Sequence, residues 1–189
     1  KAAAFIDGVA WHCYAGDVAA QSVVRDRFPS KQVWFTECAS GNWSGDWSKS
    51  FNWTIRNLII GSTRNWAKGV VMWNLALDEK HGPHLGSCGN CRGLVTINSQ
   101  SGEVTREPEY YAFAHASKFV RAGSVRVASM STDKAIESVA FQKGRNGPVT
   151  LIAVNGGEAE RKLSFAIGRK TYSATLSAGA VATFRVPVS

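Results

Sequence analysis

The sequence predicts a portion of a (β/α)8 barrel followed by an antiparallel β-sandwich. In its first part, apolar strand-like runs alternate with amphipathic helical runs, as in parallel β-α units with right-handed crossovers. After Gly123 only short β-rich runs and turn sequences remain. Polar side chains directly follow the predicted parallel strands, where a barrel carries its active site. We expect the barrel portion at residues 1–122 and the sandwich at 123–189.

Three β-α units are expected in the first part. The predicted strands are residues 8–14, 32–36 and 69–74. The predicted helices are residues 17–28, capped by Asp17 and stopped by Pro29, 51–66, and 108–119, which Pro108 begins. The third strand is apolar throughout, which is typical of a parallel strand covered on both faces. A long irregular loop is expected at 77–107, and such length suggests function.

The second part is expected to consist of short strands without helices. The predicted strands are residues 124–128, 135–142, 149–154, 162–166, 171–176 and 181–188. Asn146-Gly147 and Asn155-Gly156-Gly157 are turn sequences between them. This pattern predicts a sandwich-like module.

Composition excludes several classes of protein. The chain is 44% apolar and 19% charged, so it can bury a core, and no apolar run is long enough to predict a transmembrane segment. The formal net charge is +8, but the 22 Lys and Arg are scattered. We therefore expect a solvated basic surface and no nucleic-acid partner, with binding of an anionic polymer as the weaker alternative. The start at Lys1, without Met or a signal-peptide pattern, suggests a processed, cut or engineered start.

The four cysteines form two pairs along the chain. An even number favours disulfides and a secreted protein. Cys88 and Cys91 lie in a Gly-rich loop, which favours a structural disulfide over free thiols or a zinc site completed by His81 or His84. Cys13 and Cys38 follow neighbouring predicted strands. They could form a bridge or remain two buried thiols, and the sequence leaves both open.

Glu37 is the strongest candidate for chemistry. It follows an apolar strand, where a buried carboxylate is costly without partners. His12 and Tyr14 end the preceding strand and could hold the carboxylate ionised and aimed. Trp73 ends the next strand and could stack on a sugar ring. The alternative is a Glu that pairs with an arginine at the end of the sheet.

Four segments resemble glycoside hydrolase family 30 in the order of that family. They are Gly-Val-Ala-Trp-His-Cys-Tyr at 8–14, Trp-Phe-Thr-Glu-Cys at 34–38, Trp-Asn-Leu-Ala-Leu-Asp at 73–78 with Gly82-Pro83, and residues 111–126. The last segment resembles the final barrel helix of the family and its exit into the sandwich. The resemblance covers most of the chain.

The resemblance implies a retaining β-glycosidase. Glu37 matches the nucleophile after barrel strand seven, so the chain would contain about strands six to eight and the terminal sandwich. His12, Tyr14, Trp73 and Asn74 match residues that bind substrate or orient the nucleophile. The family's substrates include glucosylceramide, β-1,6-glucan and xylan, and the motifs lean toward the first two. The mechanism requires no metal and no organic cofactor.

The family's acid/base Glu lies in an Asn-Glu-Pro type motif, which this sequence lacks. The resemblance therefore implies a partner, the N-terminal half of the barrel that carries this residue. Without that half, the 189 residues are expected to fold poorly or self-associate, because the sheet edges would be unpaired. The alternative is a non-catalytic carbohydrate-binding or scaffold fragment.

Overall fold

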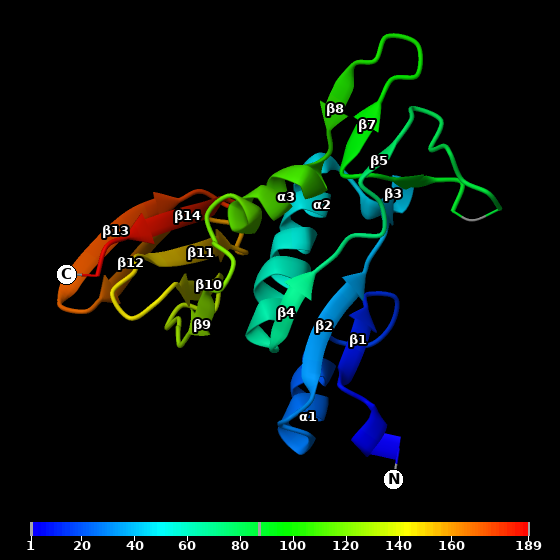
Figure 1. Ribbon diagram of the computed structural model, residues 1–189. Helices are drawn as coiled ribbons and strands as arrows, with labels where there is room; N and C mark the ends of the chain where they lie inside the picture. The colour runs from blue at the N-terminus through cyan, green and yellow to red at the C-terminus, as the bar shows by residue number, and fades with distance from the viewer. Residues whose placement is uncertain (1, 87, 189) are drawn as a thin grey trace. The chain divides into compact units, whose positions relative to one another are not determined.

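The computed structural model describes residues 2–86 and 88–188. The chain divides into two compact units, Lys1–Tyr111 and Ala112–Ser189 (Figure 1). The predicted boundary between 122 and 123 stays a prediction. No helix in the described part of the chain is both long and apolar enough to span a bilayer.

The first unit is built on a parallel sheet of three strands in the order β1-β2-β4 (Figure 1). Its strands are β1 (Gly8–His12), β2 (Gln32–Glu37) and β4 (Ala67–Val70). Its helices are the short η1 (Ala2–Phe5) and η2 (Asn42–Ser44), α1 (Ala20–Arg27), and α2 (Trp47–Trp53), which continues into the π-helix η3 (Thr54–Ser62). The sheet is open, so these residues form a barrel fragment and not a closed barrel.

Only one face of this sheet is covered. On β2, Val33 and Phe35 are buried, whereas Trp34 is 43% exposed. The expectation that residues 69–74 form a strand covered on both faces was wrong. The strand begins at Ala67 and ends at Val70, and Val71 is 54% exposed. An apolar sequence alone does not show whether one face of a strand is covered or both.

Helices α1 and α2 begin at different residues from those expected. Helix α2 begins before Phe51 because Asp46 accepts a hydrogen bond from the Lys49 amide at 2.9 Å and caps it. Helix α1 begins later than expected. Asp17 accepts from the Ala19 amide at 2.8 Å and so stabilises the turn before the helix, which has no side-chain cap.

The segment expected as an irregular loop contains regular structure. The short strands in and beside it are β3 (Ser40–Gly41), which pairs with β6 (Cys91–Arg92), and β5 (Ala76–Leu77), β7 (Val95–Ile97) and β8 (Val104–Arg106). β7 and β8 form a hairpin whose turn is fixed by Asn98, which accepts from the Gln100 and Ser101 amides. Strands this short lie below the length at which alternation is visible in a sequence.

Helix α3 (Pro108–Ser117) crosses from the first unit into the second. The second unit has a four-stranded sheet, β14-β11-β10-β9, and a two-stranded sheet, β12-β13. The strands are β9 (Val125–Val127), β10 (Ile136–Gln142), β11 (Val149–Asn155), β12 (Arg161–Ile167), β13 (Lys170–Leu176) and β14 (Val181–Val186). Each overlaps one predicted run.

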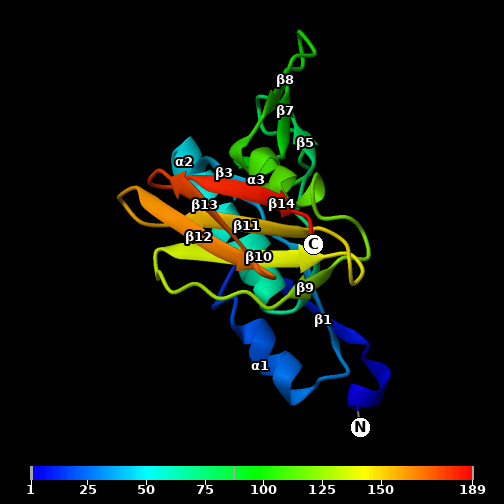
Figure 2. The same cartoon turned by 90° about the vertical axis from the view of Figure 1, so that its left-hand side faces the viewer.

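The two sheets of the second unit pack face to face (Figure 2). Ile136 and Ala153 of the larger sheet contact Leu163 and Leu176 of the smaller one. All seven residues of β11 are buried, as expected for the central strand of the unit.

Candidate active site

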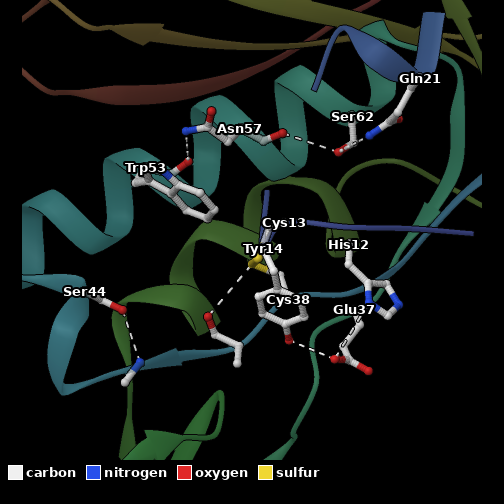
Figure 3. Close-up of a disulfide and its surroundings, with 12 residues drawn as sticks. His12, Cys13, Tyr14, Gln21, Glu37, Cys38, Ser44, Trp53, Asn57 and Ser62 are labelled. Carbon is white, nitrogen blue, oxygen red and sulfur yellow. Dashed lines mark hydrogen bonds and ion pairs between the residues drawn. A yellow bond between two sulfur atoms is a disulfide. The ribbon is translucent and has the colours of Figure 1, made fainter. Parts of the chain in front are cut away.

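Glu37 is the last residue of β2, and the end of β1 lies beside it. The two strands are parallel, with Trp11 opposite Phe35 and His12 opposite Glu37. The register therefore shifts by one residue between Trp11 and His12. Such a shift re-aims side chains at the end of a strand. It brings the polar ends of the two strands to one place (Figure 3).

Tyr14 and His12 both face the Glu37 carboxylate (Figure 3). The Tyr14 hydroxyl donates a hydrogen bond to Oε1 of Glu37 at 2.8 Å. Nδ1 of His12 lies 4.0 Å from the same oxygen, and the His12 and Tyr14 rings meet edge to face. The Glu37 side chain is 36% exposed. A carboxylate held in this way keeps its second oxygen available to a ligand.

Tyr14 is a hydrogen-bond donor over a wide pH range. Burial, the hydrogen bond to Glu37 and the charge of that carboxylate raise the pKa of Tyr14 from 10.0 to about 12. The phenol therefore stays protonated at neutral pH. Its hydrogen bond to Oε1 of Glu37 orients this carboxylate.

A disulfide joins Cys13 to Cys38, immediately beside these side chains (Figure 3). Each cysteine neighbours a residue of the cluster, Cys13 between His12 and Tyr14 and Cys38 after Glu37. The two Cα atoms are 5.3 Å apart. Of the two alternatives that the sequence left open, the structure has the bridge, and it ties the ends of β1 and β2 together.

Trp73 and Asn74 lie along the continuation of β4. The Trp73 amide donates to the Cys38 carbonyl at 3.0 Å, which places Trp73 beside the end of β2. Asn74 Oδ1 accepts from the Ala76 amide at 3.1 Å. The side-chain oxygen of Asn74 therefore stabilises the local backbone turn at residues 74–76.

An aromatic cavity adjoins the cluster, and the sequence analysis missed it. It has a volume of about 480 Å³ and is lined by Tyr14, Trp43, Trp53, Lys49 and several small residues. Tyr14 therefore faces both Glu37 and the cavity. The Trp- and Ser-rich composition of residues 38–49 indicated an aromatic surface, but it does not show which Trp side chains line a common cavity.

Gly41 explains how Trp43 reaches this cavity. A Cβ at Gly41 would lie 2.2 Å from the Trp43 ring and 2.4 Å from the Asn90 carbonyl oxygen. Only glycine permits this close approach. The strand pair β3-β6 and the position of the Trp43 ring therefore depend on the same residue.

A buried ion pair connects β6 to helix α3 through Arg92 and Glu109. Arg92 Nη2 lies 2.8 Å from Oε1 of Glu109, its Nε donates to the other carboxylate oxygen at 3.2 Å, and Ser50 also donates to Glu109. Burial of Glu109 opposes its ionisation, but the hydrogen bonds from Arg92 and Ser50 outweigh burial and hold the pKa of this carboxyl below its ordinary value. Arg92 thus pairs with Glu109 and, at 3.9 Å, with Glu107, whereas Glu37 has no Lys or Arg partner among the described ion pairs.

The Cys88-Cys91 pair also forms a disulfide. Since both sulfurs are bonded to each other, they are not zinc thiolates. Within residues 2–86 and 88–188, no three His, Cys, Asp or Glu side chains gather as metal ligands.

Two family models match the chain. The glycosyl hydrolase family 30 TIM-barrel domain matches residues 1–120, and the glycosyl hydrolase family 30 beta sandwich domain matches residues 123–184. Together they account for nearly the whole sequence.

Curated relatives match across most of the chain. "Endo-1,6-beta-D-glucanase BGN16.3" of Trichoderma harzianum is 32% identical over 96% of the chain, and "Putative glucosylceramidase 4" of Caenorhabditis elegans is 28% identical over 92%. The chain spans only 37% and 34% of these two relatives.

A solved structure shares the fold. The one described as "The endo-beta1,6-glucanase BT3312" matches with a TM-score of 0.90 and 30% sequence identity. The match covers 100% of this chain and 42% of that one.

Proposed function

The chain belongs to glycosyl hydrolase family 30, and on that premise we propose that it is the part of a retaining β-glycosidase that carries the nucleophile, Glu37. The geometry that supports this proposal is the hydrogen bond from Tyr14 to Glu37 at the carboxyl end of β2. A partly exposed carboxylate, oriented at the end of a parallel strand, has the position that nucleophilic attack requires.

In the first step, the free oxygen of Glu37 attacks the anomeric carbon and the bond to the leaving oxygen breaks. The leaving oxygen takes a proton from a second carboxylic acid, which in retaining enzymes lies about 5–5.5 Å from the nucleophile. Tyr14 keeps its hydrogen bond to Oε1 and so fixes the direction of attack. The product is a covalent ester between the sugar and Glu37.

In the second step, water attacks the same carbon on the other side and the ester bond breaks. The second carboxylate takes the proton of the water, and Glu37 returns as a carboxylate. Two displacements restore the β configuration. His12 faces the carboxylate in both steps and is proposed to bind the sugar, with Trp73 as an apolar contact at the end of the next strand.

We propose that the second carboxylic acid comes from the part of the barrel outside these residues. The strands β1, β2 and β4 would then be strands six to eight. Three observations support this. β1 and β4 each pair with a single neighbour in the described sheet, Trp34 projects from the uncovered face, and the chain spans about a third of its curated relatives.

The favoured substrate is a β-1,6-linked glucan. Two relatives named as endo-1,6-beta-D-glucanases are 30% and 32% identical, two named as putative glucosylceramidases are 28% and 30% identical, and the solved structure with a TM-score of 0.90 is described as an endo-beta1,6-glucanase. The aromatic cavity beside Tyr14 supports a polymeric substrate, since indole faces stack on sugar rings beyond the one that reacts. A glucosyl lipid is the second candidate. Two disulfides support a secreted protein.

The test compares hydrolysis of linear β-1,6-glucan, β-1,3-glucan and glucosylceramide by the chain joined to the remainder of its barrel, and by the chain alone. We expect hydrolysis of the β-1,6-glucan by the joined protein, with the β anomer released first in NMR spectra. Glu37→Gln should abolish it, and Glu79→Gln, which removes an exposed carboxylate bonded to Ser99, should not. Glucan binding without hydrolysis in the folded, joined protein would instead indicate a binding module.

A further inference from the structure

The positive charge of the chain is concentrated in the second unit. Of the 22 Lys and Arg, eleven lie in Ala112–Ser189, but only four of the 14 Asp and Glu do. This unit therefore carries +7 of the formal net charge of +8. The excess of positive charge attracts anions, and the positions of the charged side chains determine which part of the unit attracts them most.

Strand register defines the two ends of the sandwich. At one end, Gln142 pairs with both Val125 and Val149, and Val149 pairs with Val186. At the other end, Ile136 pairs with Asn155. The turn sequences that join these strands therefore project from opposite ends of the unit.

Core packing assigns the β12-β13 turn to the first of these ends. Ile167, next to that turn, packs on Ala140 and Val149. At the other end of the hairpin, Leu163 and Leu176 pack on Ile136. The turn at Gly168 and Arg169 therefore lies at the same end as the β10-β11 turn (Figure 2).

The charges separate by end. We define the basic end by seven exposed side chains, which are Lys118, Arg121, Lys143, Arg145, Arg169, Lys170 and Arg185. The acidic residues of the unit all lie at the opposite end, and they are Asp133, Glu137, Glu158 and Glu160. There Asp133 also faces Arg161, at 3.9 Å. None of the seven side chains at the basic end has an acidic neighbour among the described ion pairs.

We propose that the basic end binds an acidic polysaccharide, and that its Lys and Arg side chains contact the carboxylate groups of the polysaccharide. Lysine and arginine at turns offer charged groups on flexible stems, which can adjust to the spacing of the carboxylates along a polymer. Attraction between opposite charges, more than shape, would provide the affinity. The basic end belongs to the second unit and Glu37 to the first, so the proposed binding uses none of the residues of the candidate active site.

The exposed apolar side chains of the second unit argue against single-stranded nucleic acids and membrane surfaces as the partner. Within residues 112–188, the exposed large apolar side chains are Val125, Met130 and Val188, and none is aromatic. Single-stranded nucleic acids require aromatic faces on which bases stack, and membrane surfaces require apolar side chains that enter the bilayer. The two disulfides also favour a compartment outside the cytosol.

The test measures binding of the full chain to polygalacturonate at low and at physiological ionic strength. Arg169→Glu/Lys170→Glu and Lys143→Glu/Arg145→Glu each change the net charge by the same amount as the control, Lys134→Glu/Lys162→Glu, which lies toward the acidic end. We expect each basic-end variant to raise Kd by about tenfold or more, since each lost or reversed contact weakens attraction to the polyanion. The control should change Kd less than about twofold.

Further arms of the experiment identify the partner and check folding. Thermal unfolding must show that all three variants are folded, and Glu37→Gln should bind polygalacturonate as the unaltered chain does. Equal losses in the basic-end and control variants would mean that only net charge matters and would overturn the proposal. Tighter binding to duplex DNA or to anionic phospholipid vesicles than to polygalacturonate would also overturn it, as would no binding at low ionic strength.

Discussion

The hydroxyl of Tyr14 lies 2.8 Å from the Glu37 carboxylate, although 23 residues separate them in the chain. This contact depends on the parallel pairing of β1 with β2, on the register shift at His12 and on the adjacent disulfide. It links the fold to the proposed chemistry, because it orients the carboxylate.

Tyr14→Phe removes only the donor to Glu37. A hydrogen bond to a charged group contributes about 1.5–3 kcal/mol, so we expect kcat/KM for β-1,6-glucan to fall roughly 10- to 100-fold in the joined protein. The unfolding temperature should change little, because the side chain is exposed. Tyr172→Phe, in the sandwich, is the matched control and should retain full activity.

The same phenol determines a pH limit. Its pKa is raised from 10.0 to about 12, so the proton, and the stabilisation it brings, persists as pH passes 10 and is lost as pH rises through about 12. Absorbance titration should therefore show a tyrosine component near pH 12 that Tyr14→Phe removes. A variant whose titration curve keeps that component would contradict this assignment.

The Arg92-Glu109 pair should dominate the stability of the first unit. Glu109→Gln removes the closer and more buried of the two carboxylates paired with Arg92 and leaves Glu107 at 3.9 Å, and we expect the free energy of unfolding to fall by about 3 kcal/mol at neutral pH. The pKa of Glu109 is lowered, so its contribution is present above the ordinary value of 4.5 and is lost as pH falls through the lowered value. The difference between variant and unaltered protein in urea unfolding should shrink in acid. Glu103→Gln, which is exposed, should cost less than about 0.5 kcal/mol.

The two disulfides should differ in their effect. The Cys13–Cys38 bridge spans 25 residues and should stabilise by about 3 kcal/mol, whereas Cys88–Cys91 spans three and should contribute about 2 kcal/mol. Replacing each pair by alanine, followed by thermal unfolding and activity measurements, tests this. Only loss of the Cys13–Cys38 bridge should also lower kcat, because it ties together the strand ends that hold Tyr14 and Glu37. Equal effects on kcat would show that the bridge does not position the site.

Trp43→Ala should affect long substrates selectively. Loss of an indole face from the cavity is expected to raise KM for β-1,6-glucan by about tenfold while leaving kcat/KM for a small aryl glucoside nearly unchanged. Trp66→Ala, which removes an indole of similar exposure beneath Arg25, is the control. A similar loss on both substrates would place Trp43 at the reacting sugar and not beyond it.

The sequence carried enough information for the parts of the fold that have strong local patterns. Glu37 could be placed at a strand end because an apolar run precedes it, and the six sandwich strands are long enough for turn sequences to separate them. The resemblance of residues 8–14, 34–38 and 73–78 to a known family added the expected roles, and the family models match the same regions.

Features that depend on long-range packing could not be predicted. The Arg92-Glu109 pair joins residues whose neighbours in sequence give no sign of burial. The cavity under Trp43 depends on Gly41, and the short strands β5 to β8 have too few residues to show alternation. β4 ends at Val70, and the next residue, Val71, is exposed, although the apolar run continues in the sequence.

The most direct test of the central claim is to identify the residue that becomes covalently bound to the sugar. The chain joined to the rest of its barrel, and the chain alone, would be incubated with a 2-deoxy-2-fluoro glucoside carrying an activated leaving group. Such a reagent accumulates the glycosyl-enzyme ester, and peptide mass spectrometry locates it. We expect the label on Glu37 and no label in Glu37→Gln. A label on another carboxylate, or none in a folded protein that hydrolyses β-1,6-glucan, would contradict the assignment of Glu37 as the nucleophile.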